Sequence, residues 1–309
     1  MLKKLLHFIT VSVLCILFTI SAACTVFAAG VYEEYNCFTQ QKKSYTTHNW
    51  EQVNETPSYL VTDNSNYDIQ PYQVVDDCNL ALIDTPTVSP ITRACCQIAC
   101  LFPNGKYVYG SAVMIGPSTA LTAAHCVYKS EWGGYAKGVS VAPARYLSNR
   151  PYGYTHSSKI SIPTAFKTNT SHGNDIAVLN LQTAIGNKSG YIGCKVISPY
   201  TMIDSYNCSI EINGYPGSGY YADLSEQYTK LGEMWGMGGD CIYASGKKMR
   251  YTIDTFPGMS GAGIVTHTYG VSYPFITGVH DGYPTNITRY NWGTRIDNEY
   301  LTWINGLLK

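Results

Sequence analysis

A histidine, an aspartate and a serine stand in local contexts that suit acyl-transfer chemistry. His125 follows an apolar run, Asp175 precedes another, and Ser260 lies in a glycine-rich turn. In this chemistry the serine oxygen attacks a carbonyl carbon, while a neutral imidazole takes the serine proton and later returns it to the leaving group. A carboxylate beside the ring fixes its tautomer and stabilises the imidazolium. The residue types therefore predict His125 as the base, Asp175 as its partner and Ser260 as the nucleophile.

The order and spacing of these residues strengthen the prediction. His125 and Asp175 are 50 residues apart, and Asp175 and Ser260 are 85 apart. The order His, Asp, Ser is that of the chymotrypsin-type arrangement, in which the three groups come from distant loops. Taken singly, each has an ordinary interpretation as a core or surface histidine, a turn aspartate or a turn serine. Gly258 and Gly261 allow a tight backbone, so we expect the amides of Gly258 and Ser260 to form an oxyanion hole.

The pattern of elements around these residues indicates an all-β protein. From about Pro90 onward, short apolar runs are broken by Gly, Pro and Asn. Asn104-Gly105 between two such runs is a strong hairpin signal, and Asp297 precedes an amphipathic C-terminal segment as its expected N-cap. We expect a double six-stranded β-barrel of chymotrypsin type with a C-terminal α-helix. Strands are expected at 96–102, 107–115, 138–142, 176–181, 209–212, 249–253, 262–266 and 275–279.

Composition excludes some classes of partner. Charged residues make up 14% of the chain and cancel to a formal net charge of +0, so no basic field points to nucleic acid or to an anionic membrane. The 27 tyrosines, against only 8 phenylalanines, suit partly exposed strand surfaces. A metal site is the alternative interpretation of the cluster Cys95-Cys96-x-x-x-Cys100, but its spacing matches no common zinc pattern. We expect no metal and no cofactor.

Several motifs carry a family resemblance that extends well beyond the three catalytic candidates. From about Arg93 to the C-terminus the chain resembles the glutamyl endopeptidases, a bacterial branch of the chymotrypsin-fold, trypsin-like serine proteases. The resemblance implies a serine endopeptidase that is secreted with a propeptide and cuts proteins or peptides after acidic residues. The matching pieces are Met114-Ile-Gly-Pro, Thr122-Ala-Ala-His-Cys-Val-Tyr128, Asn213-Gly-Tyr-Pro-Gly217, Tyr251-Thr-Ile-Asp-Thr255, Gly258-Met-Ser-Gly261, Val279-His280 and Trp292-Gly-Thr-Arg-Ile296.

The N-terminal part of the chain fits this implication. Two lysines precede a nearly continuous apolar stretch, and Val26-Phe27-Ala28 ends it with residues that suit signal peptidase. We expect residues 1–28 to be a removed signal peptide, with a membrane anchor or a lipoprotein site as alternatives. Residues 29–84 lack a sustained period and are interpreted as a propeptide or N-terminal arm. Residues 85–309 would then be the protease domain, a secreted, extracellular monomer with no membrane attachment after signal removal.

Two departures from the family pattern concern the nucleophile and the cysteines. Met259 stands where relatives carry Asn, Gln or Asp. Trypsin-like enzymes place an aspartate there that pairs with the freed N-terminal amine, and the uncharged Met259 cannot form this pair. Relatives often bridge the cysteine beside the catalytic histidine to one sixteen residues upstream, and this chain has Gly110 there. Export favours disulfides. The expected hairpin would place Cys100 across from Tyr109 or Gly110, so we expect a bridge between Cys100 and Cys126.

The specificity of the predicted enzyme has competing interpretations. The resemblance places His280, with Thr255 beside it, in a pocket that receives a substrate carboxylate, which predicts cleavage after Glu and more weakly after Asp. A buried structural histidine is the alternative for His280, and Asp281 could compete for its ring. Asp254 occupies the place of the aspartate that attracts Lys or Arg in trypsin-like enzymes. A catalytically silent binding homologue is the interpretation from another class.

Overall fold

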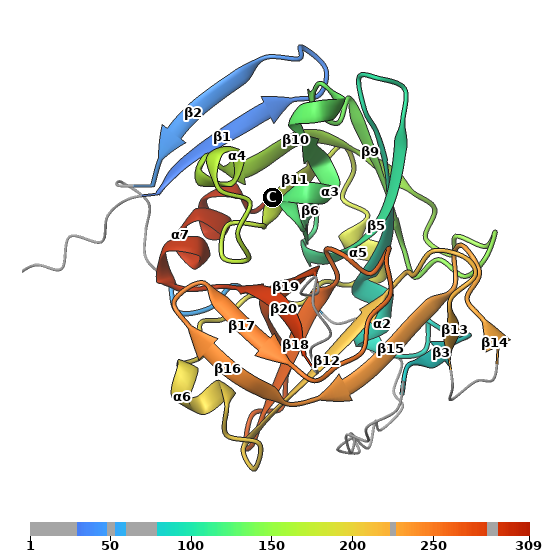
Figure 1. Ribbon diagram of the computed structural model, residues 1–309, viewed down its shortest axis with the longest axis vertical. Helices are drawn as coiled ribbons and strands as arrows, with labels where there is room; N and C mark the ends of the chain where they lie inside the picture. Colours follow the sequence, from blue (N-terminus) through green and yellow to red (C-terminus); the bar gives the residue numbers. More distant parts are fainter. Residues whose placement is uncertain (1–29, 48–52, 60–78, 223–226, 283–289) are drawn as a thin grey trace, which may run out of the picture.

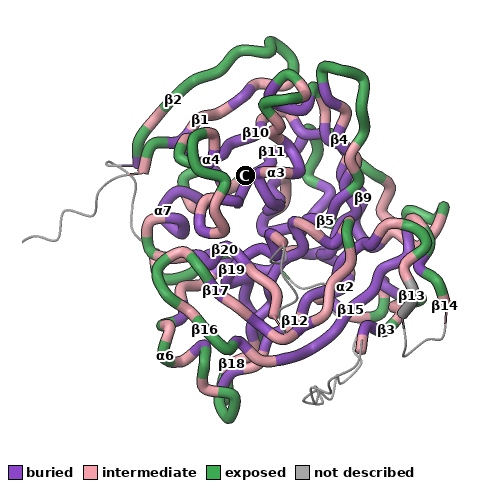
Figure 2. Tube along the Cα trace, in the orientation of Figure 1, coloured by how far each residue is buried: buried purple, intermediate pink, exposed green. Residues whose placement is uncertain are grey.

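The computed structural model describes residues 30–47, 53–59, 79–222, 227–282 and 290–309. Two antiparallel sheets dominate it, one in the upper and one in the lower half of Figure 1. The larger cluster of buried apolar side chains lies mainly in the first sheet and includes Val265, Ile276 and Val279 of the second, whereas a smaller cluster lies within the second sheet. The buried parts of the chain follow the strands in Figure 2. The expected all-β, chymotrypsin-type fold is therefore confirmed. The expected signal peptide lies outside the described residues.

The first sheet closes into a six-stranded barrel. A pairing between its first and sixth strands completes the ring, and two further strands extend the sheet. In order across the sheet the strands are β11 (Ala177–Leu181), β6 (Thr119–Thr122), β5 (Tyr107–Gly116), β4 (Cys95–Leu101), β9 (Gly138–Pro143), β10 (Thr155–Pro163), β1 (Val31–Asn36) and β2 (Lys42–Thr46).

The second sheet is curled and has eight strands where six were expected. Within the described residues no pairing joins its two outer strands. Their order is β16 (Cys241–Ser245), β17 (Lys248–Tyr251), β20 (Asn291–Arg295), β19 (Phe275–Gly282), β18 (Gly263–Thr268), β12 (Cys208–Gly214), β15 (Met234–Gly239) and β3 (Ala81–Ile83). Two small ribbons pair β7 (Tyr128–Lys129) with β8 (Gly134–Tyr135) and β13 (Tyr221–Ala222) with β14 (Gln227–Tyr228).

The helices are short except the last. The C-terminal helix α7 (Asn298–Leu307) begins where expected, because the Asp297 side chain accepts a hydrogen bond from the Tyr300 amide at 2.9 Å. None of the helices in the described part of the chain is long and apolar enough to cross a membrane. The others are α2 (Pro90–Ala94), α3 (Ala124–Val127), η1 (Ser130–Trp132), α4 (Ala165–Thr168), α5 (Gly186–Ser189) and α6 (Pro199–Met202).

The hairpin between β4 and β5 turns at the expected residues but with a different register. Gly105 has a φ of 82°, and the Lys106 amide donates to Asn104 Oδ1 at 3.0 Å. Leu101 lies across from Tyr107, so Cys100 lies across from Val108 rather than from Tyr109 or Gly110. The expected register is therefore wrong. Ile98 is the residue opposite Gly110.

Part of the segment expected to be irregular is an ordered hairpin. β1 pairs with β10 and with β2, and the fully buried Tyr32 ring stacks on Trp303 of α7 with 4.5 Å between centroids. The Tyr32 hydroxyl donates to Glu299 at 2.7 Å. The sequence lacks a long apolar alternation here because the hairpin buries few of its side chains. Its role as a propeptide remains a prediction.

Candidate active site

The three catalytic candidates meet in one cleft of about 320 Å³. His125 comes from α3 and Asp175 from the loop before β11, both in the part of the chain that forms the first barrel. Ser260 comes from the loop before β18 in the second sheet. The residues that line the cleft are His125, Thr170, His172, Asp175, Thr255, Phe256, Pro257, Ser260, His280, Asp281 and Gly282.

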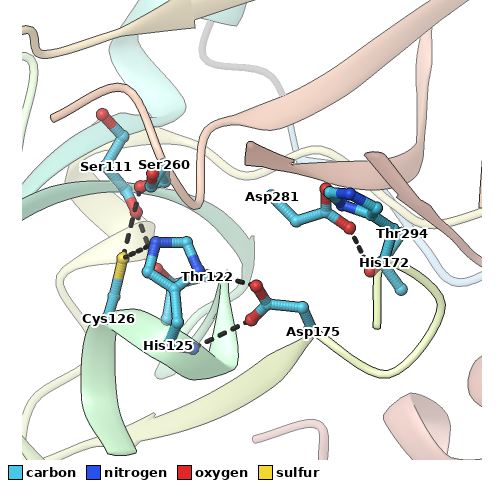
Figure 3. A network of polar contacts seen from close by, with 9 residues as sticks. All are labelled: Ser111, Thr122, His125, Cys126, His172, Asp175, Ser260, Asp281 and Thr294. Atoms are coloured by element: carbon cyan, nitrogen blue, oxygen red, sulfur yellow. Dashed lines mark hydrogen bonds and ion pairs between the residues drawn. The ribbon is translucent and has the colours of Figure 1, made fainter. Parts of the chain in front are cut away.

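Asp175 holds His125 at two points. Its Oδ2 lies 2.6 Å from the ring Nδ1, and its Oδ1 accepts the backbone amide of His125 at 2.8 Å (Figure 3). The carboxylate therefore fixes the ring with Nδ1 toward itself and leaves Nε2 for proton transfer. Burial acts against protonation of the ring, but Asp175 and the neighbouring Cys126 outweigh it and raise the pKa of His125 well above its ordinary value. The expected base–carboxylate geometry is present.

Ser260 lies beside this pair without a hydrogen bond to it. Within the described residues no such bond joins the Ser260 hydroxyl to His125. Instead, His125 Nε2 is 3.6 Å from Cys126 Sγ, and the same sulfur is 3.6 Å from the Ser260 carbonyl oxygen (Figure 3). Catalytic hydrogen bonds are often long in proteins without substrate and shorten when substrate binds. The predicted nucleophile Ser260 and the predicted base His125 therefore line one cleft, without a hydrogen bond between their side chains in the absence of substrate.

A buried serine that the sequence did not single out holds the nucleophile loop in place. The Ser111 amide donates to the Ser260 carbonyl at 2.8 Å, and the Ser111 hydroxyl donates to the Gly258 carbonyl at 2.9 Å. The same hydroxyl accepts the Tyr215 amide at 2.8 Å. Because Ser111 lies inside a strand of the opposite barrel, its sequence context carried no signal of this role. These bonds tie the nucleophile loop to β5.

The nucleophile loop presents two free amides, as an oxyanion hole requires. Gly258 has a φ of 103°, and a Cβ there would lie 2.7 Å from both the Gly217 nitrogen and the Tyr215 oxygen. Only glycine fits this backbone. In the described part of the chain neither the Gly258 amide nor the Ser260 amide has a hydrogen-bond partner. Met259, between them, is fully buried in the core of the second sheet.

His280 lines the cleft but is almost fully buried, with a relative exposure of 2%. Burial, reinforced by His125, lowers the pKa of His280 to about 3. The Tyr251 hydroxyl lies 2.6 Å from Nδ1 of the ring and donates to the Trp292 carbonyl at 2.7 Å. A hydroxyl carries one proton, and Tyr251 gives it to the Trp292 carbonyl. The proton in the contact between Tyr251 and His280 is therefore on Nδ1 of the ring. Nε2 of the neutral ring is then bare.

Thr255 and Asp254 are adjacent in sequence but differ in position. Thr255 lines the cleft, whereas Asp254 is not among the described residues that line it. Asp254 Oδ2 accepts the backbone amide of Asn79 at 3.1 Å. Its carboxylate is therefore engaged by the segment before β3, away from the cleft surface.

Asp281 turns away from His280 and pairs with His172, a contact that the sequence did not predict. Asp281 Oδ1 lies 2.8 Å from His172 Nδ1, and Oδ2 accepts the Thr294 hydroxyl at 2.7 Å (Figure 3). Burial raises the pKa of Asp281, while the contacts with His172 and Thr294 act in the opposite direction. The expected competition of Asp281 for the His280 ring is not observed. The pairing partner lies over a hundred residues away, so local sequence could not show it.

The cysteines are unbonded in the described part of the chain, and the bridge expected between Cys100 and Cys126 is not formed. The bridge remains a prediction: the register places Cys100 opposite Val108, while burial, and after it the nearby Cys126, raises the pKa of Cys100 well above its ordinary value. Cys126 instead faces Gly110, where a Cβ would lie 3.1 Å from its sulfur. The position of the missing partner cysteine is thus occupied by a glycine. Within the described residues, no group of three or more His, Cys, Asp or Glu side chains could hold a metal ion.

Comparisons with known proteins agree with this geometry. The model of the Trypsin family matches residues 87–199. This segment, which includes His125 and Asp175, is thus similar to the Trypsin family. The solved structure of a Glu endopeptidase in complex with MPD has a TM-score of 0.59 at 25% identity, covering 76% of this chain and 98% of that one. The predicted fold and the resemblance to glutamyl endopeptidases are thereby confirmed.

Two curated relatives match this chain by sequence. A glutamyl endopeptidase of Bacillus licheniformis is 31% identical over 190 residues, which are 60% of this chain and 55% of that protein. An extracellular metalloprotease of Bacillus subtilis is 26% identical over 243 residues, 77% of this chain and 71% of that protein. The chain thus spans about half the length of the glutamyl endopeptidase that it matches. These relatives support a protease hydrolase.

Proposed function

We propose that this protein is a serine endopeptidase that cuts protein or peptide chains after glutamate, and more weakly after aspartate. The observation that carries the proposal is the His125–Asp175 pair at 2.6 Å in the same cleft as Ser260, Thr255 and His280. The free Gly258 and Ser260 amides support it, because preorganised donors at the reacting oxygen are among the largest contributions to acyl-transfer rates.

The mechanism follows from the roles of the three side chains. His125 Nε2 takes the hydroxyl proton as Ser260 Oγ attacks the scissile carbonyl carbon, and Asp175 stabilises the imidazolium. The Gly258 and Ser260 amides donate to the oxyanion of the tetrahedral intermediate. As the carbon–nitrogen bond breaks, His125 gives its proton to the leaving amine. Water then repeats the attack on the acyl-enzyme with His125 as base, which releases the acid product and restores Ser260.

Specificity for an acidic residue rests on His280 and Thr255. Thr255 can donate a hydroxyl hydrogen bond to a carboxylate, and charge-assisted bonds of this kind are the strong ones. Because Nε2 of neutral His280 is bare, binding of a carboxylate there brings a proton onto this nitrogen. The position of Asp254, bonded by the Asn79 amide away from the cleft lining, favours acidic specificity over cleavage after Lys or Arg.

Export and maturation complete the proposal. Residues 1–28 act as a signal peptide, and the mature enzyme begins between about residues 68 and 88. Within this range the bond after Asp84 suits self-cleavage by an acid-specific enzyme. The N-terminal sequence of the active extracellular form checks this. An active species that begins at Ala29 or Gly30 contradicts a removed propeptide, and the docked β1–β2 hairpin would then be a permanent part of the enzyme.

One experiment tests the core of the proposal. The purified enzyme is treated with a serine-directed phosphonylating reagent and, separately, with a metal chelator, and is then assayed on a mixed peptide library. We expect loss of activity with the first reagent, a label on Ser260, and no loss with the chelator. Library products should end in Glu, and less often in Asp.

The variants Ser260→Ala and His280→Ala separate chemistry from specificity. Ser260→Ala should fold and be exported but lose most turnover, and His280→Ala should cut while losing most of its preference for Glu. Full activity of Ser260→Ala would contradict the mechanism. Inactivity of the wild type on every peptide would favour a catalytically silent binding homologue. Cleavage after Lys or Arg would mean that Asp254, and not His280, determines the specificity.

A further inference from the structure

His172 is held in the cleft by groups from two strands of the second sheet. Its Nδ1 faces Asp281, whose side chain is fully buried, and its ring stacks on Trp292 with 4.8 Å between centroids and an interplanar angle of 7°. Thr294 in turn holds the second oxygen of Asp281. Burying a charge is costly unless it is paired. A buried carboxylate is therefore not expected beside a surface histidine that has no role.

The free edge of the ring faces the cleft. In an imidazole ring Nε2 lies across from the Nδ1 edge, so a ring whose Nδ1 faces a buried carboxylate directs Nε2 away from it. The His172 side chain has a relative solvent exposure of 34% and lines the same cleft as Ser260 and His280. Within the described residues no hydrogen bond engages Nε2 of His172. The ring is therefore oriented, with a polar edge available to a ligand.

We propose that His172 is a second substrate-recognition residue, which binds an acidic side chain of the substrate within two residues of the scissile bond. The proposal rests on the proposed peptidase function of the same cleft. Because Nδ1 is held by the Asp281 carboxyl group, Nε2 is the ring atom left to form a hydrogen bond with an anionic side chain of the substrate. The protein thus prefers clustered acidic residues, one in the His280 pocket and one at His172.

A purely structural role for the pair makes a different prediction. His172 lies three residues before Asp175, so the His172–Asp281 contact could merely hold this loop. Loss of such a role would slow the cleavage of all peptides alike. Loss of a recognition contact changes only the discrimination between substrates that differ at the contacted position.

The test uses pairs of peptides that share the residue at the scissile bond and differ by Asp or Asn at one of the two positions on either side of it. For wild type we expect kcat/KM to favour Asp over Asn by about tenfold at one of these positions. His172→Gln should bring that ratio close to one. The control His267→Gln changes a histidine that also contacts a carboxylate, Glu211 at 3.3 Å, but lies outside the cleft, and it should keep the wild-type ratio.

The double variant His172→Ala/Asp281→Asn protects the test against misfolding, since it leaves no unpaired buried charge. It should also lose the Asp/Asn discrimination while cutting the Asn peptide. A wild-type ratio near one at all positions, or an equal loss on both peptides in His172→Gln, overturns the proposal. Because the two peptides of each pair have the same residue at the scissile bond, the Asp/Asn ratio of kcat/KM can be measured even if the enzyme does not prefer Glu at that bond.

Discussion

Two histidine–aspartate pairs share one cleft, and their likeness is close. The Nδ1–carboxylate distances are 2.6 Å for His125–Asp175 and 2.8 Å for His172–Asp281, and the histidine side chains are 31% and 34% exposed. The surroundings differ. The first pair has Ser260 and two free amides beside it, whereas the second has the face of Trp292. A histidine–carboxylate pair alone does not make a catalytic base, so we expect this role only for His125, which lies beside Ser260 and the two amides.

The largest expected difference comes from removing each carboxylate's charge. Asp175→Asn should lower kcat by about 10⁴-fold, because the amide no longer holds the tautomer that His125 needs. Asp281→Asn should lower kcat/KM by no more than about tenfold, the order of one charge-assisted contact. Steady-state kinetics on one Glu-containing peptide measures both. Equal losses of activity in the two variants would contradict the assignment of the catalytic role to the His125–Asp175 pair alone.

We expect oxyanion donors beside the first pair only, and glycine substitutions test them. Gly258→Ala should lower kcat by about 100- to 1,000-fold, since a Cβ there meets the backbone of residues 215–217 and displaces an amide donor. Gly105→Ala is the matched control: its φ is also positive, at 82°, but nothing lies within 4 Å of its added Cβ. It should keep kcat while losing some stability. A similar loss of kcat in both variants would mean that backbone strain alone is responsible.

Comparing the sequence with the structure shows which parts of this cleft are predictable. His125, Asp175 and Ser260 each stand in a recognisable local motif next to a largely apolar strand, so their prediction needed no long-range contact. β15 was missed because three of its six residues are glycine, which is rare inside strands. The His172–Asp281 pair and Ser111 were missed because their partners are defined only by folding.

The third expected effect concerns pH and distinguishes the catalytic ring from the recognition ring. The raised pKa of His125 means that the base is protonated at low pH, so activity should rise with pH as the ring loses its proton. The lowered pKa of His280 has the opposite consequence, since carboxylate binding there takes up one proton. The ratio of kcat/KM for Glu over Gln peptides should therefore fall by up to about tenfold per pH unit.

Profiles from about pH 5 to pH 9 on a matched Glu and Gln peptide measure both limbs. His280→Ala serves as the control, because it should retain the rise in activity with pH while its Glu/Gln ratio becomes small and flat. A Glu/Gln ratio in wild type that is constant over this range would show that His280 already carries its proton at Nε2. The tautomer assigned through Tyr251 and Trp292 would then be wrong.

The smallest expected effect on catalysis comes from Gly110→Cys, beside the first pair. A Cβ at this position lies 3.1 Å from Cys126 Sγ, close to the separation of about 3 Å between a Cβ and the far sulfur that the bond geometry of a disulfide gives. The nearest other atoms are the Ser260 carbonyl oxygen at 3.3 Å and Ile98 Cγ1 at 3.4 Å, so the new side chain fits with small shifts. We expect a disulfide that closes a short loop and stabilises the fold by about 3 kcal/mol.

The bridge would also draw Cys126 Sγ away from His125 Nε2, which it contacts at 3.6 Å. Since the base then keeps Asp175 and loses only a thiol neighbour, kcat should stay within about threefold of wild type, well inside the effect of any catalytic substitution. Thiol titration before and after reduction, thermal unfolding and kinetics follow the three consequences, with Gly110→Ser as the unbridged control. If Gly110→Cys forms the bridge and loses activity as severely as Asp175→Asn, the free Cys126 thiol takes part in catalysis together with His125, Asp175 and Ser260.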